Sequence, residues 1–267
     1  MKKKLFCFIC TMVMILTIPV IVSAKTYGGE LQALTKDPNG NPYTIVWIVD
    51  ESRETLYIEG KGSIPDVSGS CPWMVYKGNI KHLIIDDGIN AIPKRGFADL
   101  SALETILLPD TMKDIGMYAF MNCASLKEIV IPGSTYYVQD QAFVGCKSLK
   151  KVIFETGYPD IPPQYGARLF GECTSLEDVY IYNPNAKISR SRSNDVDGVW
   201  FRDINDFSKL TIHCIKGTNA DKYFTEDIYT ITNQSEGIDG NTTNTSIVLK
   251  PNYMTENGYS LNVDYIE

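Results

Sequence analysis

The sequence predicts a solenoid, in which short coils of similar sequence stack along one axis and share a core. The first observation is a heptapeptide of the form Phe-x-x-Cys-x-x-Leu, which occurs in four copies and has a leucine at the cysteine position of the first copy. The second is the spacing, because the copies begin at Phe97, Phe120, Phe143 and Phe170 and so lie 23, 23 and 27 residues apart. A period of this length is typical of repeat proteins whose neighbouring units bury a continuous core.

A strand pattern that follows each heptapeptide is the third observation. The closing leucine begins Leu-x-x-Ile-x-Ile, or a conservative variant, at residues 103–108, 126–131, 149–154 and 176–181. Leucines in this spacing and period indicate a leucine-rich-repeat array. With degenerate copies at both ends, we expect strands to open at Ile80, Leu103, Leu126, Leu149, Leu176 and Phe207. The predicted fold class is an α/β-type leucine-rich-repeat solenoid of about six stacked parallel strands, with short helical or irregular turns and an N-terminal β-hairpin cap.

Residues 1–24 have the form of a secretory signal peptide. Lys2, Lys3 and Lys4 precede an apolar run over residues 5–22, and a small-residue site ends at Ala24. This order predicts export with cleavage after Ala24, and the alternative is an uncleaved membrane anchor. No second apolar stretch approaches membrane length, so we expect a secreted or cell-surface protein with no membrane span in the mature chain.

Removal of the signal makes the chain more acidic. The sequence has 25 basic and 32 acidic residues, and three lysines leave with the signal, so 22 minus 32 gives a net charge of about −10. Nucleic acids and other polyanions require a concentrated Lys and Arg surface. We therefore expect no nucleic-acid partner.

The ends of the predicted solenoid need caps, because the outermost strands of an array have unpaired edges. Residues 25–79 are assigned to an N-terminal cap, in which residues 44–62 alternate apolar and polar around a turn at 50–54 and predict a hairpin. Residues 80–216 form the solenoid, and residues 217–232 form a C-terminal cap with a helix over Asn219–Thr225 and a strand over 228–231. Residues 233–267 begin as an Asn-, Thr-, Ser- and Gly-rich linker and can form a hairpin around Asn257-Gly258.

Five cysteines remain after the signal is removed: Cys71, Cys123, Cys146, Cys173 and Cys214. Three of them, Cys123, Cys146 and Cys173, occupy equivalent positions in adjacent coils, where strands lie about 4.8 Å apart. That separation permits a disulfide, but an odd number of thiols cannot all pair. We favour buried free thiols that pack as small hydrophobic groups, with a disulfide as the alternative.

Metal-binding and catalytic patterns are weak or missing. Neither His82 nor His213 lies in a Cys/His cluster with ligand spacing. The segment Asp195-x-Asp197-Gly198 covers only part of a calcium loop, and Ile204 stands where a bidentate Glu belongs. The motifs of zinc proteases, serine hydrolases and phosphate-binding loops are absent from the sequence. We therefore expect no metal, no cofactor and no enzymatic activity.

The repeat unit extends to Phe-x-x-Cys-x-x-Leu-x-x-Ile-x-Ile-Pro, with Pro109 and Pro132 closing two strands and Cys71-Pro72-Trp73 preceding the first coil. Over roughly residues 47–231 the chain thereby resembles the BspA-like, or Treponema pallidum-type, leucine-rich repeats of bacterial cell-surface proteins. It lacks the asparagine that follows the strand in the better-known leucine-rich repeat. The resemblance implies a role in adhesion and in binding matrix proteins such as fibronectin and fibrinogen.

A row of outward-facing apolar side chains is the first candidate partner surface. Side chains alternate across a strand, so the residue between two buried anchors faces outward in each coil. Across the coils these residues are Ile84, Leu107, Val130, Ile153, Tyr180 and Thr211. The row beside it is polar and of mixed charge: His82, Thr105, Glu128, Lys151, Asp178 and Lys209. An apolar stripe can mark a partner surface, although strands also favour β-branched residues for themselves.

Two insertions are the second candidate surface. Residues 162–168 contain four extra residues and residues 189–200 contain eight, at the same point of adjacent coils, so we expect the two loops to touch. Loops on a rigid scaffold often carry recognition, and a tolerated insertion without a role is the alternative. The residue types that dominate interfaces are Tyr165, Arg168, Arg190, Arg192 and Trp200.

These observations predict an exported, non-enzymatic recognition or adhesion protein that binds another protein or a host matrix component. The alternative is a glycan-binding or cell-wall-associated module. Its stacking platforms would be Tyr165, Tyr180, Tyr182 and Trp200.

Overall fold

The computed structural model describes residues 25–67, 71–157, 163–188, 200–201, 209–225 and 262–266, and the backbone of residues 229–236 and 242–249. The signal peptide, Arg190, Arg192 and the Asp195-x-Asp197-Gly198 segment lie outside these residues.

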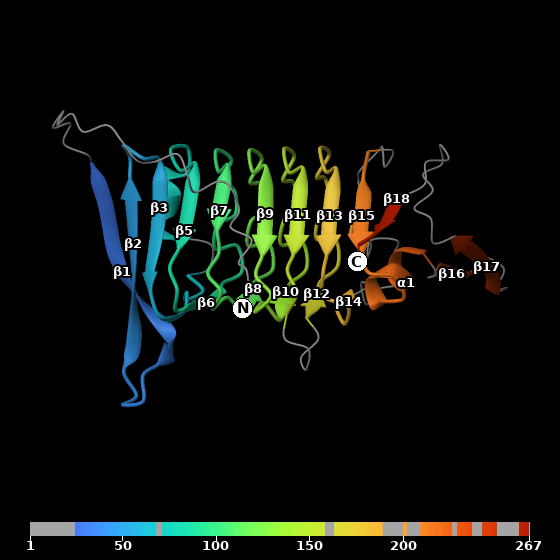
Figure 1. Ribbon diagram of the computed structural model, residues 1–267, viewed down its shortest axis with the longest axis horizontal. Coiled ribbons are helices and arrows are strands. Elements are labelled where there is room, and N and C mark those ends of the chain that lie inside the picture. The colour runs from blue at the N-terminus through green and yellow to red at the C-terminus, as the bar shows by residue number, and fades with distance from the viewer. Residues whose placement is uncertain are drawn as a thin grey trace.

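Parallel strands stacked along one axis form the main face of the molecule, here called the strand face (Figure 1). One hydrogen-bonded set contains β3 (Thr55–Gly60), β5 (His82–Ile85) and β7 (Thr105–Leu107). The next contains β9 (Glu128–Ile131), β11 (Lys151–Phe154), β13 (Asp178–Ile181) and β15 (Thr211–Cys214). The repeats predicted β5, β7, β9, β11, β13 and β15, so the solenoid is confirmed.

A second parallel ladder closes each coil on the opposite side of the core. It consists of β4 (Gly62–Ser63), β6 (Ile89–Ile92), β8 (Asp114–Ile115), β10 (Tyr137–Val138), β12 (Gln164–Tyr165) and β14 (Lys187–Ile188). Hydrogen-bonded turns join the two ladders. Among the described residues the helices are the 3-10 helix η1 (Pro72–Tyr76) and α1 (Asn219–Thr225), and none is long and apolar enough to cross a membrane.

A column of stacked aromatic rings runs through the core. The centroid distances are 5.6 Å from Phe97 to Phe120, 5.4 Å from Phe120 to Phe143 and 5.9 Å from Phe143 to Phe170. Stacked neighbours continue the column beyond both ends: Trp73, Phe201 and Phe224. Aromatic pairs at such distances contribute roughly 0.5–1.5 kcal/mol beyond the area that they bury, so the repeated phenylalanine holds successive coils together.

The repeated cysteine bonds to the coil before it. The thiols of Cys123 and Cys146 donate to the carbonyl oxygens of Phe97 (3.3 Å) and Phe120 (3.2 Å), and Cys173 donates to that of Phe143 (3.2 Å). The five cysteines of the described chain are buried and free. Burial raises the pKa of the Cys123 and Cys173 thiols, which keeps them protonated as donors.

The N-terminal cap is an antiparallel sheet of three strands rather than a hairpin alone. The predicted hairpin consists of β2 (Pro42–Asp50) and β3, and β1 (Thr26–Lys36) pairs with the far side of β2. Strand β1 has no clear alternating pattern that would predict it, because Ala33 is its one buried residue. Since β3 pairs in parallel with β5, the cap joins the solenoid without a break.

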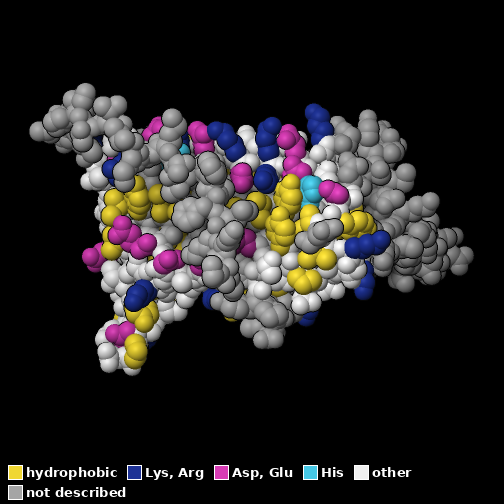
Figure 2. Space-filling view, in the orientation of Figure 1, with side chains coloured by type: hydrophobic (Ala, Val, Ile, Leu, Met, Phe, Trp, Pro, Cys, Tyr) yellow, Lys and Arg dark blue, Asp and Glu magenta, His cyan; other side chains and the backbone are white. Residues whose placement is uncertain are grey.

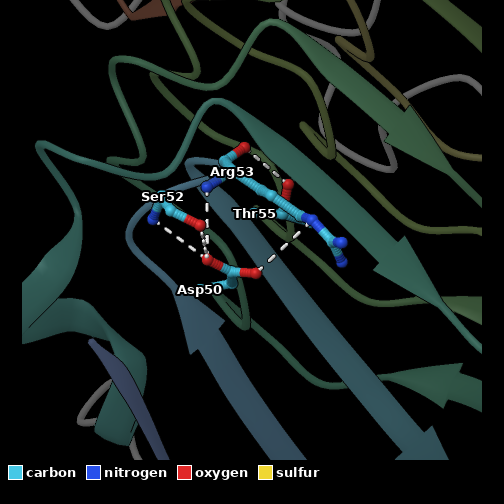
Figure 3. A network of polar contacts seen from close by, with 4 residues as sticks. All are labelled: Asp50, Ser52, Arg53 and Thr55. Atoms are coloured by element: carbon cyan, nitrogen blue, oxygen red, sulfur yellow. Dashed lines mark hydrogen bonds and ion pairs between the residues drawn. The ribbon is translucent and has the colours of Figure 1, made fainter. Parts of the chain in front are cut away.

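The turn between β2 and β3 is organised by one carboxylate (Figure 3). Asp50 Oδ1 accepts hydrogen bonds from the Ser52 hydroxyl (2.7 Å) and from the backbone N–H groups of Ser52 (3.0 Å) and Arg53 (3.2 Å). Arg53 Nε lies 3.7 Å from Asp50 Oδ2, and the Thr55 hydroxyl donates to the Arg53 carbonyl (2.8 Å). These contacts, the Ser52 hydroxyl foremost, hold the pKa of Asp50 below its ordinary 3.8.

The C-terminal end differs in part from expectation. Helix α1 confirms the predicted cap helix. Residues 233–236, expected to lie in a linker, belong to β16 (Tyr229–Glu236), which pairs with β17 (Thr242–Leu249). The possible hairpin turn at Asn257-Gly258 lies outside the described residues, and beyond it β18 (Asn262–Tyr265) pairs in parallel with β15. A hydrogen bond from the Tyr265 hydroxyl to Asp221 Oδ1 (3.1 Å) ties β18 to α1.

Candidate partner-binding surface

The strand face presents a row of partly exposed apolar side chains. In β5, β9, β11, β13 and β15 the second and fourth residues are buried, whereas the first and third face outward. Leu107 is 61% exposed and pairs in register with Ile84, and in the next hydrogen-bonded set the register aligns three partly exposed side chains: Val130, Ile153 and Tyr180. The structure therefore brings these predicted surface residues into one line.

The sixth position of the row differs from expectation. The ladder pairs Tyr180 with His213, and Asp178 with Thr211. Thr211 thus belongs to the polar row, and Lys209 lies before the strand.

This two-residue error arose because the sequence offers two possible central anchors, Leu210 and Ile212. In the ladder Val179 pairs with Ile212 and Ile181 pairs with Cys214. A cysteine at the last strand anchor does not fit the repeat pattern, so it hid the correct alignment.

The N-terminal cap extends the row. The outward residues Tyr57 of β3 and Ile48 of β2 continue it beyond Ile84. We call the complete line the outer row; it contains Ile48, Tyr57, Ile84, Leu107, Val130, Ile153, Tyr180 and His213.

A histidine and two carboxylates form the C-terminal end of the outer row. His213 stacks on Tyr180 with centroids 4.1 Å apart and an interplanar angle of 5°. Its Nε2 lies 2.7 Å from Asp178 Oδ1, and its Nδ1 lies 3.5 Å from Asp264 Oδ2. Lys151 Nζ lies 5.3 Å from the centroid of the Tyr180 ring. Because Lys151 and His213 come from strands on opposite sides of β13, both faces of the Tyr180 ring are covered.

Ion pairs between successive coils border the outer row on one side. Lys81 Nζ contacts Glu54 (2.7 Å), Lys150 Nζ contacts Glu177 (3.0 Å), and Lys127 contacts Glu104. Figure 2 shows basic and acidic side chains along the upper edge of the strand face, above the hydrophobic ones. Exposed pairs of this kind contribute at most about 1 kcal/mol each and are screened by salt, so they add charge to the border more than stability.

Unpaired carboxylates border the row on the other side. They lie at or just beyond the carboxyl ends of the strands, and each is exposed: Glu59, Asp86, Asp87, Asp110 and Glu155. Within the described part of the chain, none of these forms an ion pair. The outer row therefore has a mixed-charge border on one side and an acidic border on the other.

The structure places two predicted loop residues in the core. Tyr165 is 2% exposed and takes the position in β12 that Val138 takes in β10. Trp200 is fully buried, and its indole N–H donates to the Gly166 carbonyl (2.9 Å). Neither side chain can reach a partner, so their prediction as contact residues is wrong.

The spacing already contained the signal for Tyr165. Ile115 precedes Phe120 by five residues, and Tyr165 precedes Phe170 by the same interval, so Tyr165 is the equivalent of Ile115 in its coil. The extra residues of this coil therefore lie before β12, not after it. Arg168 is partly exposed with a φ of 54°, while Arg190 and Arg192 fall outside the described residues.

A shallow groove lies on the second ladder, away from the strand face. Its lining includes Met117, Tyr137, Gln139, Asp140 and Gln164, and Tyr137 is 47% exposed. In the described residues there is no group of three or more His, Cys, Asp and Glu side chains that could hold a metal ion.

Known proteins share the repeat. The family model for the BspA type Leucine rich repeat region matches residues 74–193 with six copies, and no curated protein matches the chain. A leucine-rich repeat protein of T. pallidum is 21% identical, with 62% of this chain and 67% of that chain covered and a TM-score of 0.42.

Two further solved structures are similar over shorter parts of their length. A leucine rich cell surface protein of Faecalibacterium prausnitzii is 24% identical, with 45% of this chain and 35% of that chain covered and a TM-score of 0.35. A leucine-rich repeat protein of Bacteroides ovatus is 19% identical, with 59% and 50% covered and a TM-score of 0.32. This chain thus spans less than two thirds of the length of either protein.

The match covers the coils whose Phe-x-x-Cys-x-x-Leu unit builds the aromatic column and the thiol bonds, and no catalytic family is indicated. Residues 74–193 therefore form a leucine-rich repeat region of the BspA type.

Proposed function

We propose that the protein is an exported, non-enzymatic recognition protein that binds another protein, including proteins of a host matrix, through the outer row. The observation that carries the proposal is the row of partly exposed apolar side chains on the stacked strands, with Leu107 61% exposed near its middle. An apolar centre with a charged rim is the usual composition of a protein interface. Export is inferred from the signal-like residues 1–24.

The dimensions of the outer row favour a protein over a small molecule. It crosses eight strands, which at a spacing of about 4.8 Å gives a length of about 34 Å. A surface of this length suits a standard protein interface, whereas small ligands bind in concave pockets. The ladder fixes the backbone before binding, so little conformational entropy is lost on association.

The test is binding of the purified protein to immobilised fibronectin and fibrinogen, measured by surface plasmon resonance. Leu107→Asp should weaken binding at least tenfold, because it places an unpaired charge at the centre of the apolar line. Val75→Asp is the matched control, since Val75 is 81% exposed and lies in η1, outside the outer row. Equal affinities for wild type and Leu107→Asp would show that the outer row is not the binding surface.

Glycan binding remains the second candidate function, but at a different place. Tyr165 and Trp200 are buried and both faces of Tyr180 are covered, so these rings cannot stack on a sugar. The shallow groove on the second ladder combines the exposed ring of Tyr137 with the polar side chains of Gln139 and Gln164. Saccharide binding on a glycan array that Tyr137→Ala abolishes, and Leu107→Asp leaves unchanged, would favour this function over protein binding.

A further inference from the structure

The shallow groove on the second ladder differs in composition from the outer row. The register of β10 and β12 places Tyr137 beside Gln164, and both side chains are exposed. Gln139 and Asp140 follow β10 directly, and Gly166 follows β12. The lining therefore combines one exposed aromatic ring with two side-chain amides and one carboxylate.

Neighbouring coils hold the polar groups of the groove in place. Asp140 Oδ1 accepts a hydrogen bond from the Ala167 N–H (2.8 Å), and Gln139 Nε2 donates to both carboxylate oxygens of Asp114 (2.8 and 3.1 Å). Gly166 leaves no room for a side chain, since a Cβ there would lie 2.4 Å from the Asp140 amide nitrogen. Groups that are restrained before binding lose less entropy when a ligand arrives.

Two oxygen atoms of the lining remain as acceptors. Because Gln139 Nε2 faces Asp114, the other amide atom of Gln139 is the acceptor Oε1. Among the described residues, no hydrogen bond reaches Gln139 Oε1 or Asp140 Oδ2. The ring of Tyr137, 47% exposed, offers an apolar face in the same groove. A ligand with several hydroxyl donors and an apolar C–H face matches this arrangement.

We propose that the groove binds an uncharged saccharide, whose hydroxyl groups donate to Gln139 Oε1 and Asp140 Oδ2 while a pyranose ring stacks on Tyr137. The proposal rests on the second candidate function, because it names the class of glycan that the same groove takes. From Met117 to Gln164 the groove extends over three adjacent coils. Two strand spacings give about 10 Å, so a segment of two sugar rings fills it.

The charge of the groove selects against acidic glycans. Asp140 is the one charged residue of this lining, and Asp114 adds a second carboxylate beside Gln139. The basic residue Lys187 pairs with Gln164 in the ladder but lies one strand beyond the lining. A uronic acid, sialic acid or sulfate group in the groove would meet a like charge, and such repulsion is a common source of specificity.

The experiment is a glycan array that carries neutral, amino and acidic saccharides, probed with the purified full-length protein after export. The wild type should bind neutral saccharides about tenfold more tightly than their acidic counterparts, as expected for one repulsive contact near the surface. Asp140→Asn keeps an oxygen acceptor for the Ala167 N–H and removes the charge. It should therefore reduce this preference to about twofold or less.

Two tyrosine variants show whether the array reports on the groove. Tyr137→Ala should abolish the binding of neutral saccharides. Tyr136→Ala is the matched control and should bind as the wild type does, since Tyr136 is not among the lining residues and its ring lies under Lys113 Nζ (4.9 Å). Circular dichroism of each variant checks that the solenoid is folded.

The outcomes separate this proposal from the function on which it rests. Binding that prefers acidic or amino saccharides and is lost in Tyr137→Ala would leave glycan binding in place and overturn the uncharged class. Binding that Tyr137→Ala leaves unchanged would overturn the groove as the site. A wild type that binds no saccharide would overturn both the proposal and the second candidate function.

Discussion

The regular coils and the longer coils keep the same core by different means. In the regular coils a small residue precedes the phenylalanine of the following repeat, and its carbonyl accepts the hydrogen bond from the phenylalanine of the coil before, as Ala142 does from Phe120 (2.8 Å). In the longest coil the same position is Trp200, whose carbonyl accepts from Phe170 at 2.9 Å. The backbone step is therefore conserved while the side chain grows from a methyl group to an indole.

The difference teaches what an insertion does in this solenoid. The two aromatic residues near the insertions, Tyr165 and Trp200, both pack on Phe154, with centroid distances of 4.3 and 5.6 Å. Beside each insertion the core thus holds a large aromatic side chain. In this chain the aromatic residues near an insertion are therefore part of the core, not of a binding loop.

The prediction with the largest expected effect is that the long coil needs the indole of Trp200 for its stability as much as a regular coil needs its phenylalanine. Phe120→Ala and Trp200→Ala should each lower the free energy of unfolding by about 3–5 kcal/mol, because each leaves a large cavity among packed rings. Guanidinium denaturation followed by far-UV circular dichroism measures both.

The exposed Val75→Ala serves as the control and should change stability by less than about 0.5 kcal/mol. A Trp200→Ala value as small as this control would mean that the long coil does not close on Trp200.

The second prediction concerns the pH dependence of stability that arises from the buried thiols at the two ends of the solenoid. Burial raises the pKa of the Cys71 and Cys214 thiols from 9.0 to about 11. Below pH 9 the two thiols are protonated in the folded and in the unfolded chain, so their burial does not lower the free energy of unfolding. Between pH 9 and 11 the unfolded chain loses these protons first, so stability should fall by about 1.4 kcal/mol per pH unit for each thiol.

Urea denaturation at pH 8, 9, 10 and 11 measures this slope. The double variant Cys71→Ala, Cys214→Ala should have a shallower slope than the wild type, although it is less stable at pH 8. Identical slopes would show that the end thiols do not report on folding.

Most of the fold could be predicted, because the repeated residue pattern marks the strands of each coil. The Phe, Cys, Leu and Ile positions recur with little change, so alignment fixed the strands from β5 to β13 and their buried anchors. The ends were predictable only in part. At Cys214 an atypical anchor shifted the alignment by two residues, and β1 and β18 owe their place to pairing with β2 and β15, which no local pattern reveals.

The candidate site was predictable where it follows the ladder and not where it follows loop length. Ile84 to Tyr180 share an outward position because strand alternation is local. The sequence favours Tyr165 and Trp200 as surface residues, because aromatic and arginine side chains in an insertion suggest recognition. Burial of an aromatic ring beside an insertion depends on its neighbours in three dimensions, and the sequence spacing offered only the five-residue interval from Tyr165 to Phe170 as a hint.

The prediction with the smallest expected effect concerns the hydrogen bond from the cysteine thiol to the preceding coil, and whether it contributes equally to stability in coils of different length. Cys146 donates across 26 residues to Phe120, and Cys173 donates across 30 residues to Phe143, both at 3.2 Å. Replacing either by Ala removes one buried hydrogen bond and leaves a small void, so each variant should lose about 1–2 kcal/mol of unfolding free energy. Cys146→Ser and Cys173→Ser keep a donor and serve as paired controls in the same denaturation assay. If only Cys146→Ala lowered the free energy of unfolding, the hydrogen bond of Cys173 in the longer coil would contribute less to stability than that of Cys146, although the two distances are equal.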